Sequence, residues 1–268
     1  MTRIVTIAAM LLAFPFRLGA AQVATGNPPA GDAVARARID EILTRLEQRG
    51  QDLQDIRCKV RFVEEDRVNL STRVKTGEIG FMMTDTTPLF MIFFERTVVD
   101  GIVGKKEWYL FDGRWLYQGL ERLAQVTKQE YVREGETIDL FNLETAPFPV
   151  PFGQKKERIL KNFDVEVRPS AAGDPPNTDH LVCVPKADSP LYGKYDQMEF
   201  FVARDVHLPS RIIVVKNDGY EANTADFPDL SAKSINVGLT KKDFDRPSAW
   251  RAYKEVVEPT APIPSKAP

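Results

Sequence analysis

The 268-residue sequence contains few of the side chains that enzymes and metalloproteins use for chemistry. It has two cysteines and two histidines, and the spacing of His180 and His207 does not suggest a metal pair. It also lacks the G-x-S-x-G motif of serine hydrolases and a glycine-rich loop that could bind phosphate between a strand and a helix. We therefore expect no catalysis and no metal or organic cofactor. A hydrolase is the minor alternative, because site geometry need not be visible in a sequence.

The sequence has no excess of charge of one sign. Its 36 basic and 38 acidic residues give a net charge of −2, and the basic residues are spread along the chain. Proteins that bind nucleic acid usually gather lysine and arginine in a patch or stripe. We therefore expect no nucleic-acid partner.

Long uncharged runs are absent except near the N-terminus. Arg3 precedes an uncharged run of eleven residues, 4–14, and Pro15, Gly19 and Ala21 follow it. The run is shorter than the roughly 20 residues that span a bilayer. A basic start, a short apolar run and small residues before the cleavage point are typical of a secretory signal peptide. We expect residues 1–21 to be removed and the remaining chain to be a soluble periplasmic protein.

The two cysteines, Cys58 and Cys183, are too few to form a disulfide framework in a chain of this length. Export would permit one disulfide bond. Cys58 lies on the apolar side of a predicted strand, which suits an inert buried thiol better than a nucleophile. We expect both thiols to be free, with a single disulfide as the alternative.

One helix precedes a long series of strands. After a flexible lead at 22–31, apolar residues recur at helical spacing and predict an amphipathic helix over 33–49, with Asp32 as its N-cap. From Ile56 onward the apolar period is two, which is typical of half-buried strands. Asp-Gly pairs at 100–101, 112–113 and 218–219 favour hairpin turns. Short strands with such turns predict an antiparallel, mainly β fold.

Proline marks two other segments. Residues 146–153 cannot form a central strand, because proline removes a backbone donor, and a short helix is expected at 154–163. The tail at 254–268 is rich in proline and is expected to be disordered. With no internal repeat and no linker in between, we expect a single domain over 32–253.

Two hairpins allow predictions of strand register. A two-residue turn at 112–113 would pair Leu110 with Trp115 and Trp108 with Tyr117. Since directly opposed residues share a face of a sheet, one uncharged face would carry these four side chains. A turn at 218–219 would pair Lys216 with Glu221 and Arg211 with Asp226, so that opposite charges meet.

The segment 88–95 is apolar on both faces of its predicted strand. Phe90, Ile92 and Phe94 alternate with a second apolar set, Leu89, Met91 and Phe93. A strand of this kind must be covered on both sides. One side can pack on a helix while the other lines a cavity, although an ordinary core on both sides explains the pattern equally well.

The order of these segments resembles the LolA family of periplasmic lipoprotein carriers and its wider lipid-binding superfamily. The segments that carry the resemblance are DEILTRLEQRG with IRCKVRF, TGEIGFMMTDTTPLFMIFF, WYLFDGRWLYQ with LAQVTKQ, HLVCVPK, MEFFVARDVHLPSRIIVVKNDG and DFDRP. Together they cover residues 38–247 in the order of the family. Each motif is loose by itself, and their order is the specific part.

The resemblance implies a fold and a function. The fold would be an incomplete antiparallel β-barrel around a hydrophobic cavity, with the helices at 33–49 and 154–163 as lids or plugs. The function would be to bind lipid acyl chains or lipoproteins as a monomeric carrier, with membrane-bound donor and acceptor proteins as partners. A periplasmic sensor of the same fold, similar to envelope-stress regulators, is the main alternative. The expected lipid-binding residues are Phe90, Ile92, Phe94, Trp108, Leu110, Trp115 and Tyr117.

Overall fold

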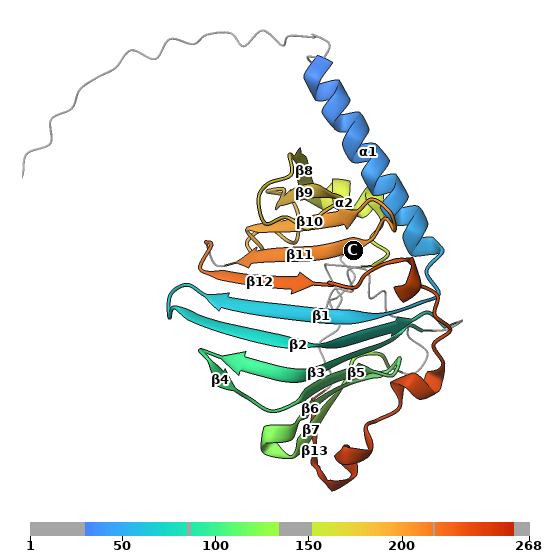
Figure 1. Cartoon of the computed structure of the whole chain (residues 1–268), viewed down its shortest axis with the longest axis vertical. Coiled ribbons are helices and arrows are strands. Elements are labelled where there is room, and N and C mark those ends of the chain that lie inside the picture. The colour runs from blue at the N-terminus through green and yellow to red at the C-terminus, as the bar shows by residue number, and fades with distance from the viewer. Residues whose placement is uncertain (1–29, 85–86, 134–151, 217, 260–268) are drawn as a thin grey trace, which may run out of the picture.

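The protein is built around one large sheet that curls without closing. The computed structural model describes residues 30–84, 87–133, 152–216 and 218–259 (Figure 1). The expected signal peptide and most of the proline-rich segment at 146–153 lie outside the described residues. The strand order is β13-β7-β6-β5-β3-β2-β1-β12-β11-β10-β9-β8, with the short β4 paired to β3. All strand pairs are antiparallel except β13 with β7, which confirms the mainly β, incomplete-barrel prediction.

The strands form two groups that are consecutive in sequence. The first group and the helix before it are α1 (Ala30–Gln51), β1 (Asp55–Asp66), β2 (Ser71–Met82), β3 (Leu89–Val99), β4 (Ile102–Val103), β5 (Glu107–Phe111), β6 (Trp115–Leu120) and β7 (Gln125–Glu130). The second group follows α2 (Lys156–Asn162) and comprises β8 (Phe163–Arg168), β9 (Thr178–Pro185), β10 (Gln197–Ala203), β11 (Pro209–Lys216) and β12 (Glu221–Asp226). Three short 3₁₀ turns and β13 (Lys254–Glu258) follow β12.

A seam between β1 and β12 joins the two groups into one sheet. Its ladder runs from Arg61 opposite Asp226 to Asp66 opposite Glu221. The other half of β1 has no β12 partner, and the segment after β12 covers it: Asp55 accepts hydrogen bonds from the backbone N–H groups of residues 237–239. The seam therefore places strands that are far apart in sequence side by side.

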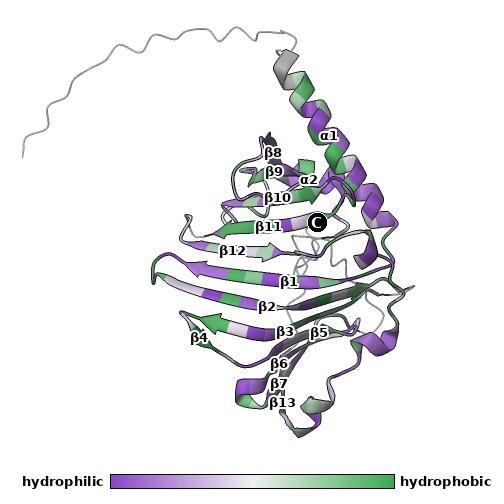
Figure 2. Cartoon of the chain, viewed as in Figure 1, coloured by the Kyte–Doolittle hydropathy of each residue, from purple (hydrophilic) through white to green (hydrophobic). Residues whose placement is uncertain are grey.

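Helix α1 packs along one end of the sheet, next to α2 and β8 (Figure 1). Ile42, Leu43 and Leu46 are buried, while charged residues occupy the other side of the helix (Figure 2). The amphipathic helix is thus confirmed, but it begins at Ala30. Residues 30–31 are therefore helical rather than part of a flexible lead, and Asp32 lies inside the first turn and is not an N-cap.

The hairpin at Asp112-Gly113 differs from the predicted register by two residues. Phe111 pairs with Leu116 and Leu110 with Tyr117, so the loop holds four residues. The Asp112 carboxylate accepts hydrogen bonds from the backbone N–H groups of Arg114 and Trp115 at 3.0 and 2.8 Å, which stabilises the longer loop. Because strand side chains alternate with a period of two, a shift of two keeps every side chain on its predicted face. The Asp218-Gly219 hairpin has the predicted register, with Lys216 opposite Glu221 and Arg211 opposite Asp226, and Arg211 forms an ion pair with Asp226.

The C-terminal segment forms a second cover on the convex face of β3, β5 and β6. Phe244 and Trp250 pack there against Trp108, Leu110 and Tyr117. Residues 254–258 then pair with β7, so the prediction of disorder from residue 254 is wrong for this stretch. Its valines favour a strand, and β7 offers an unpaired edge; the proline content that suggested disorder begins only at Pro259.

Trp250 lies directly on the backbone of Gly119, and this contact needs a residue without a side chain. An added Cβ at Gly119 would be 2.5 Å from Nε1 of Trp250. We expect Gly119→Ala to lower the free energy of unfolding by about 1–3 kcal/mol through overpacking, measured by denaturant melts. Gly104→Ala is the control, because its Cβ would meet Thr97 at an ordinary 3.5 Å. Equal stability of the two variants would contradict the contact.

Both cysteines are free and buried, as expected. Burial raises the pKa of Cys58 and of Cys183 to about 12. We expect neither thiol to react with iodoacetamide at pH 8 in the folded protein, and both to react after unfolding. The free energy of unfolding should also fall as pH rises from about 9 toward 12, because only the unfolded chain then gains thiolates. Mass spectrometry measures the labelling, and alkylation of either thiol in the native protein would contradict the prediction.

Candidate functional site

The described residues form a cavity of about 480 Å³, open to solvent, on the concave side of the sheet. This volume falls within the roughly 300–1,000 Å³ of pockets that bind small molecules. The cavity lies across the seam, since its walls come from both strand groups. Its lining is mostly aliphatic and aromatic, and comprises Val60, Phe62, Glu64, Lys75, Ile79, Phe90, Ile92, Phe94, Tyr109, Leu116, Gln154, Tyr195, Met198, Phe200, Ile212, Val214, Lys216, Asn223, Ala225 and Phe227.

Strand pleating explains which residues face the cavity. Side chains alternate between the two faces of a strand, so Val60, Phe62 and Glu64 of β1 all face the same way. Across the seam, the register places Ala225 opposite Phe62 and Asn223 opposite Glu64. The concave face therefore follows from the registers of the ladders once one of its members is known.

Three of the seven expected site residues line the cavity. These are Phe90, Ile92 and Phe94 of β3. The other apolar face of β3 packs with the convex cluster, in which Phe93 stacks on Trp108 with ring centroids 5.3 Å apart. Strand β3 is thus covered on both sides, as its sequence predicted.

The other four expected residues are on the wrong face for a cavity. Trp108, Leu110, Trp115 and Tyr117 share one face, as predicted, but that face is convex and belongs to the cluster around Trp250. The register between β3 and β5 decides this, because it pairs Met91 with Leu110 and Ile92 with Tyr109. The sequence of the hairpin predicts which residues share a face, but it does not predict which face becomes concave.

Tyr109 and Leu116 are the hairpin residues that line the cavity instead. The pairing of β3 with β5 would have identified them, because it places Tyr109 beside Ile92. The residues contributed by β10, β11 and β12 were also missed. These residues line the cavity only because β1 pairs with β12, and no local sequence pattern predicts that pairing.

The cavity changes from apolar to polar along its length. Ile79, Phe90 and Phe227 lie toward the end remote from the β1–β2 and β11–β12 hairpin turns, with Gln154 as the polar exception. Toward the hairpin turns of β1–β2 and β11–β12, the lining becomes Glu64, Lys75, Lys216 and Asn223. The lining changes from apolar to polar between the same two ends on β1, β2, β11 and β12, because each of these strands runs from one end of the cavity to the other (Figure 1). The cavity is therefore amphipathic from end to end.

Lys75 anchors a buried ion cluster in the wall near the polar end. Its side chain is 6% exposed, and its Nζ lies 3.0 Å from Oε2 of Glu107 and 3.7 Å from Oε2 of Glu64. Glu64 also pairs with Arg73 at 3.2 Å. The ammonium group stands 5.4 Å from the ring centroid of Phe94, within range of a cation–π contact. Two cations and two carboxylates thus balance each other within the wall.

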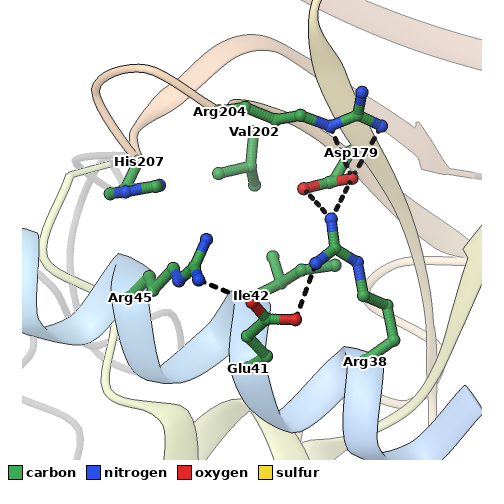
Figure 3. Close-up of a pocket in the computed structure, with 8 residues that line it drawn as sticks. All are labelled: Arg38, Glu41, Ile42, Arg45, Asp179, Val202, Arg204 and His207. Atoms are coloured by element: carbon green, nitrogen blue, oxygen red, sulfur yellow. Dashed lines mark hydrogen bonds and ion pairs between the residues drawn. The ribbon is translucent and has the colours of Figure 1, made fainter. Parts of the chain in front are cut away.

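A smaller pocket lies between α1 and the turns beside it. Figure 3 shows Arg38, Glu41 and Arg45 of the helix facing Asp179 and Arg204. Burial would raise the pKa of the Asp179 carboxyl, but hydrogen bonds from Arg204 and Arg38 outweigh it and lower the pKa. At about 50 Å³ this pocket is too small for an acyl chain. The ion pair between Arg38 and Asp179 attaches α1 to β9.

The histidines have structural surroundings. Nε2 of His180 lies 2.6 Å from Oε2 of Glu199, and its ring stacks on Phe201. His207 lines the small pocket beside Arg45 (Figure 3). Within the part of the chain that the structure describes, no group of three histidine, cysteine or acidic residues could hold a metal ion. None of the helices in the described ranges is long and apolar enough to cross a membrane.

Removal of the Lys75 ammonium would leave the partly buried Glu107 carboxylate without the cation that lies 3.0 Å away, while Glu64 would keep Arg73. We expect Lys75→Met to lower the free energy of unfolding by about 3–5 kcal/mol, measured by denaturant melts. A second substitution, Glu107→Gln, should recover part of the loss. Lys106→Met is the control, since Lys106 is exposed and next in sequence to Glu107. Equal losses for Lys75→Met and Lys106→Met would contradict the cluster.

Comparison with known proteins gives loose structural likenesses. No protein-family model matches the sequence, and no curated protein sequence matches it. An uncharacterized conserved protein from Thermus thermophilus is similar at 12% identity and a TM-score of 0.48, over 82% of this chain and 99% of that one. A LolA superfamily protein from Nitrosomonas europaea is similar at 9% identity and 0.33, over 78% and 97%. The MucA/MucB complex from Pseudomonas aeruginosa is similar at 15% identity and 0.44, over 79% and 62%.

Proposed function

We propose that this protein binds the acyl chains of lipids or lipoproteins in the cavity on its concave face. The observation that carries the proposal is a cavity of about 480 Å³ whose walls are mostly aliphatic and aromatic. Such walls recognise hydrocarbon by removing it from water and need no precise polar contact. The proposal requires no catalytic group.

The energy available to hydrocarbon in this cavity is large enough for useful affinity. Each buried methylene contributes about 0.8 kcal/mol, so a chain with ten of them gains about 8 kcal/mol. Association costs at least about 4 kcal/mol in lost freedom of motion. A chain must therefore enter along most of its length, and the apolar lining around Ile79, Phe90 and Phe227 favours such entry. Short or branched polar ligands gain too little to bind.

We further infer that the chain works as a carrier in the periplasm. The layout of residues 1–21 is typical of an exported protein. Its ligand would be taken from and given to membrane-bound proteins. A carrier must bind its ligand by burying it and must release the ligand without breaking a covalent bond. An apolar cavity meets both requirements.

Filling the cavity tests the proposal without damaging the core. Ala225 lines the cavity, and its neighbour Thr224 points to the other face of β12. We expect Ala225→Leu to weaken binding of dodecanol at least about fivefold, because the added methyl groups take space from the ligand. Thr224→Leu is the matched control and should bind as the wild type does. Binding is measured by calorimetric titration of the purified protein.

Denaturant melts complete this test. A residue that adds apolar contacts in a cavity should leave stability unchanged or raise it. Wild-type protein that binds neither dodecanol nor dodecanoate would overturn the proposed function. Equal dodecanol binding by Ala225→Leu and Thr224→Leu would show that the ligand binds outside this cavity.

A further inference from the structure

The polar end of the cavity carries one positive charge that the wall does not balance. The four groups around Lys75 neutralise each other, as described above. Lys216, at the end of β11, also lines the cavity, and its Nζ stands 5.5 Å from the ring centroid of Tyr195. Among the described residues, the ion pairs of the structure do not include Lys216. Glu221 lies opposite it in the ladder and is exposed to solvent.

The surroundings of Lys216 suit the head of an amphiphile. Asn223 lines the cavity on the neighbouring strand and can donate hydrogen bonds through its amide. Glu64 is opposite Asn223 in the seam, but Arg73 and Lys75 already pair with its carboxylate. A negative group between Lys216 and Asn223 would therefore meet one available cation and one amide, and a carboxylate whose charge is already compensated.

We propose that the cavity selects amphiphiles with an anionic head, a carboxylate or a phosphate, held by Lys216 and Asn223 at the polar end. The hydrocarbon tail then extends toward Ile79, Phe90 and Phe227. This proposal rests on the proposed function and adds the class and the orientation of the ligand. The amphipathic lining fixes that orientation, because the reverse one would bury the anion among aromatic and aliphatic groups at a high desolvation cost.

The test compares ligands that share a tail and differ in the head. Dodecanoate, dodecyl phosphate and dodecanol are titrated calorimetrically into the purified full chain, below their micelle concentrations. We expect the better of the two anions to bind about tenfold more tightly than dodecanol, which corresponds to about 1.4 kcal/mol. Preference for dodecanoate indicates a fatty acid as the source of the head, and preference for dodecyl phosphate indicates a phospholipid. Either supports the proposal.

Two lysines beside the same tyrosine provide a matched pair of variants. Lys194 also contacts the ring of Tyr195, at 5.3 Å, but does not line the cavity. Lys216→Gln should abolish the preference for anions over dodecanol, whereas Lys194→Gln should keep the preference. Lys216→Glu should reverse it, so that dodecylammonium binds more tightly than dodecanoate.

The outcomes separate this proposal from the proposed function. If dodecanol and the two anions bind equally, or if Lys216→Gln keeps the preference, the assignment of an anionic head is wrong while acyl-chain binding stands. If none of the three ligands binds, the proposed function itself fails. Denaturant melts of the three variants check that each is folded, and Lys216→Glu supplies a gain of binding that misfolding cannot produce.

Discussion

Both faces of strand β3 must be covered, and the rest of the fold is arranged around this requirement. Six successive residues of this strand, Leu89–Phe94, are apolar, so neither face tolerates water. The C-terminal segment covers the convex face through Phe244 and Trp250. On the concave face, side chains of α1, α2 and Phe152 belong to the same hydrophobic cluster as Phe90 and Phe94. The sheet also bends round until β10, β11 and β12 stand opposite β3. The cavity is what the bend leaves unfilled.

The sequence predicts local features well because they depend on short periodicities. The switch from helical to strand spacing near Ile56 and the predicted register of the β11–β12 hairpin are both present in the structure. The grouping of Trp108, Leu110, Trp115 and Tyr117 on one face also holds, since a register shift of two preserves faces. Their assignment to the cavity was wrong because concavity is a property of the whole sheet. Strand β13 was missed because its partner, β7, is about 130 residues away in sequence.

The polar end of the cavity is the part that sequence reasoning could least foresee. Lys75 on β2 and Lys216 on β11 are unremarkable strand residues in isolation, each next to charged or polar neighbours. They come to one site only because β1 and β12 pair and bring the two strand groups together. The ion cluster around Lys75 also limits collapse of the wall. Buried charges must keep their partners, so the strands that carry them cannot slide inward to fill the space.

The seam has a consequence for how the chain reaches its native state. Strands β1 to β7 pair with near neighbours in sequence, and so do β8 to β12, whereas Arg61 and Asp226 are 165 residues apart. Contacts between distant residues form more slowly than local ones, because loop closure must precede them. We expect each strand group to acquire hydrogen-exchange protection first and the amides of the β1–β12 ladder last. The cavity then forms in the final step of folding, so the folding intermediates lack it.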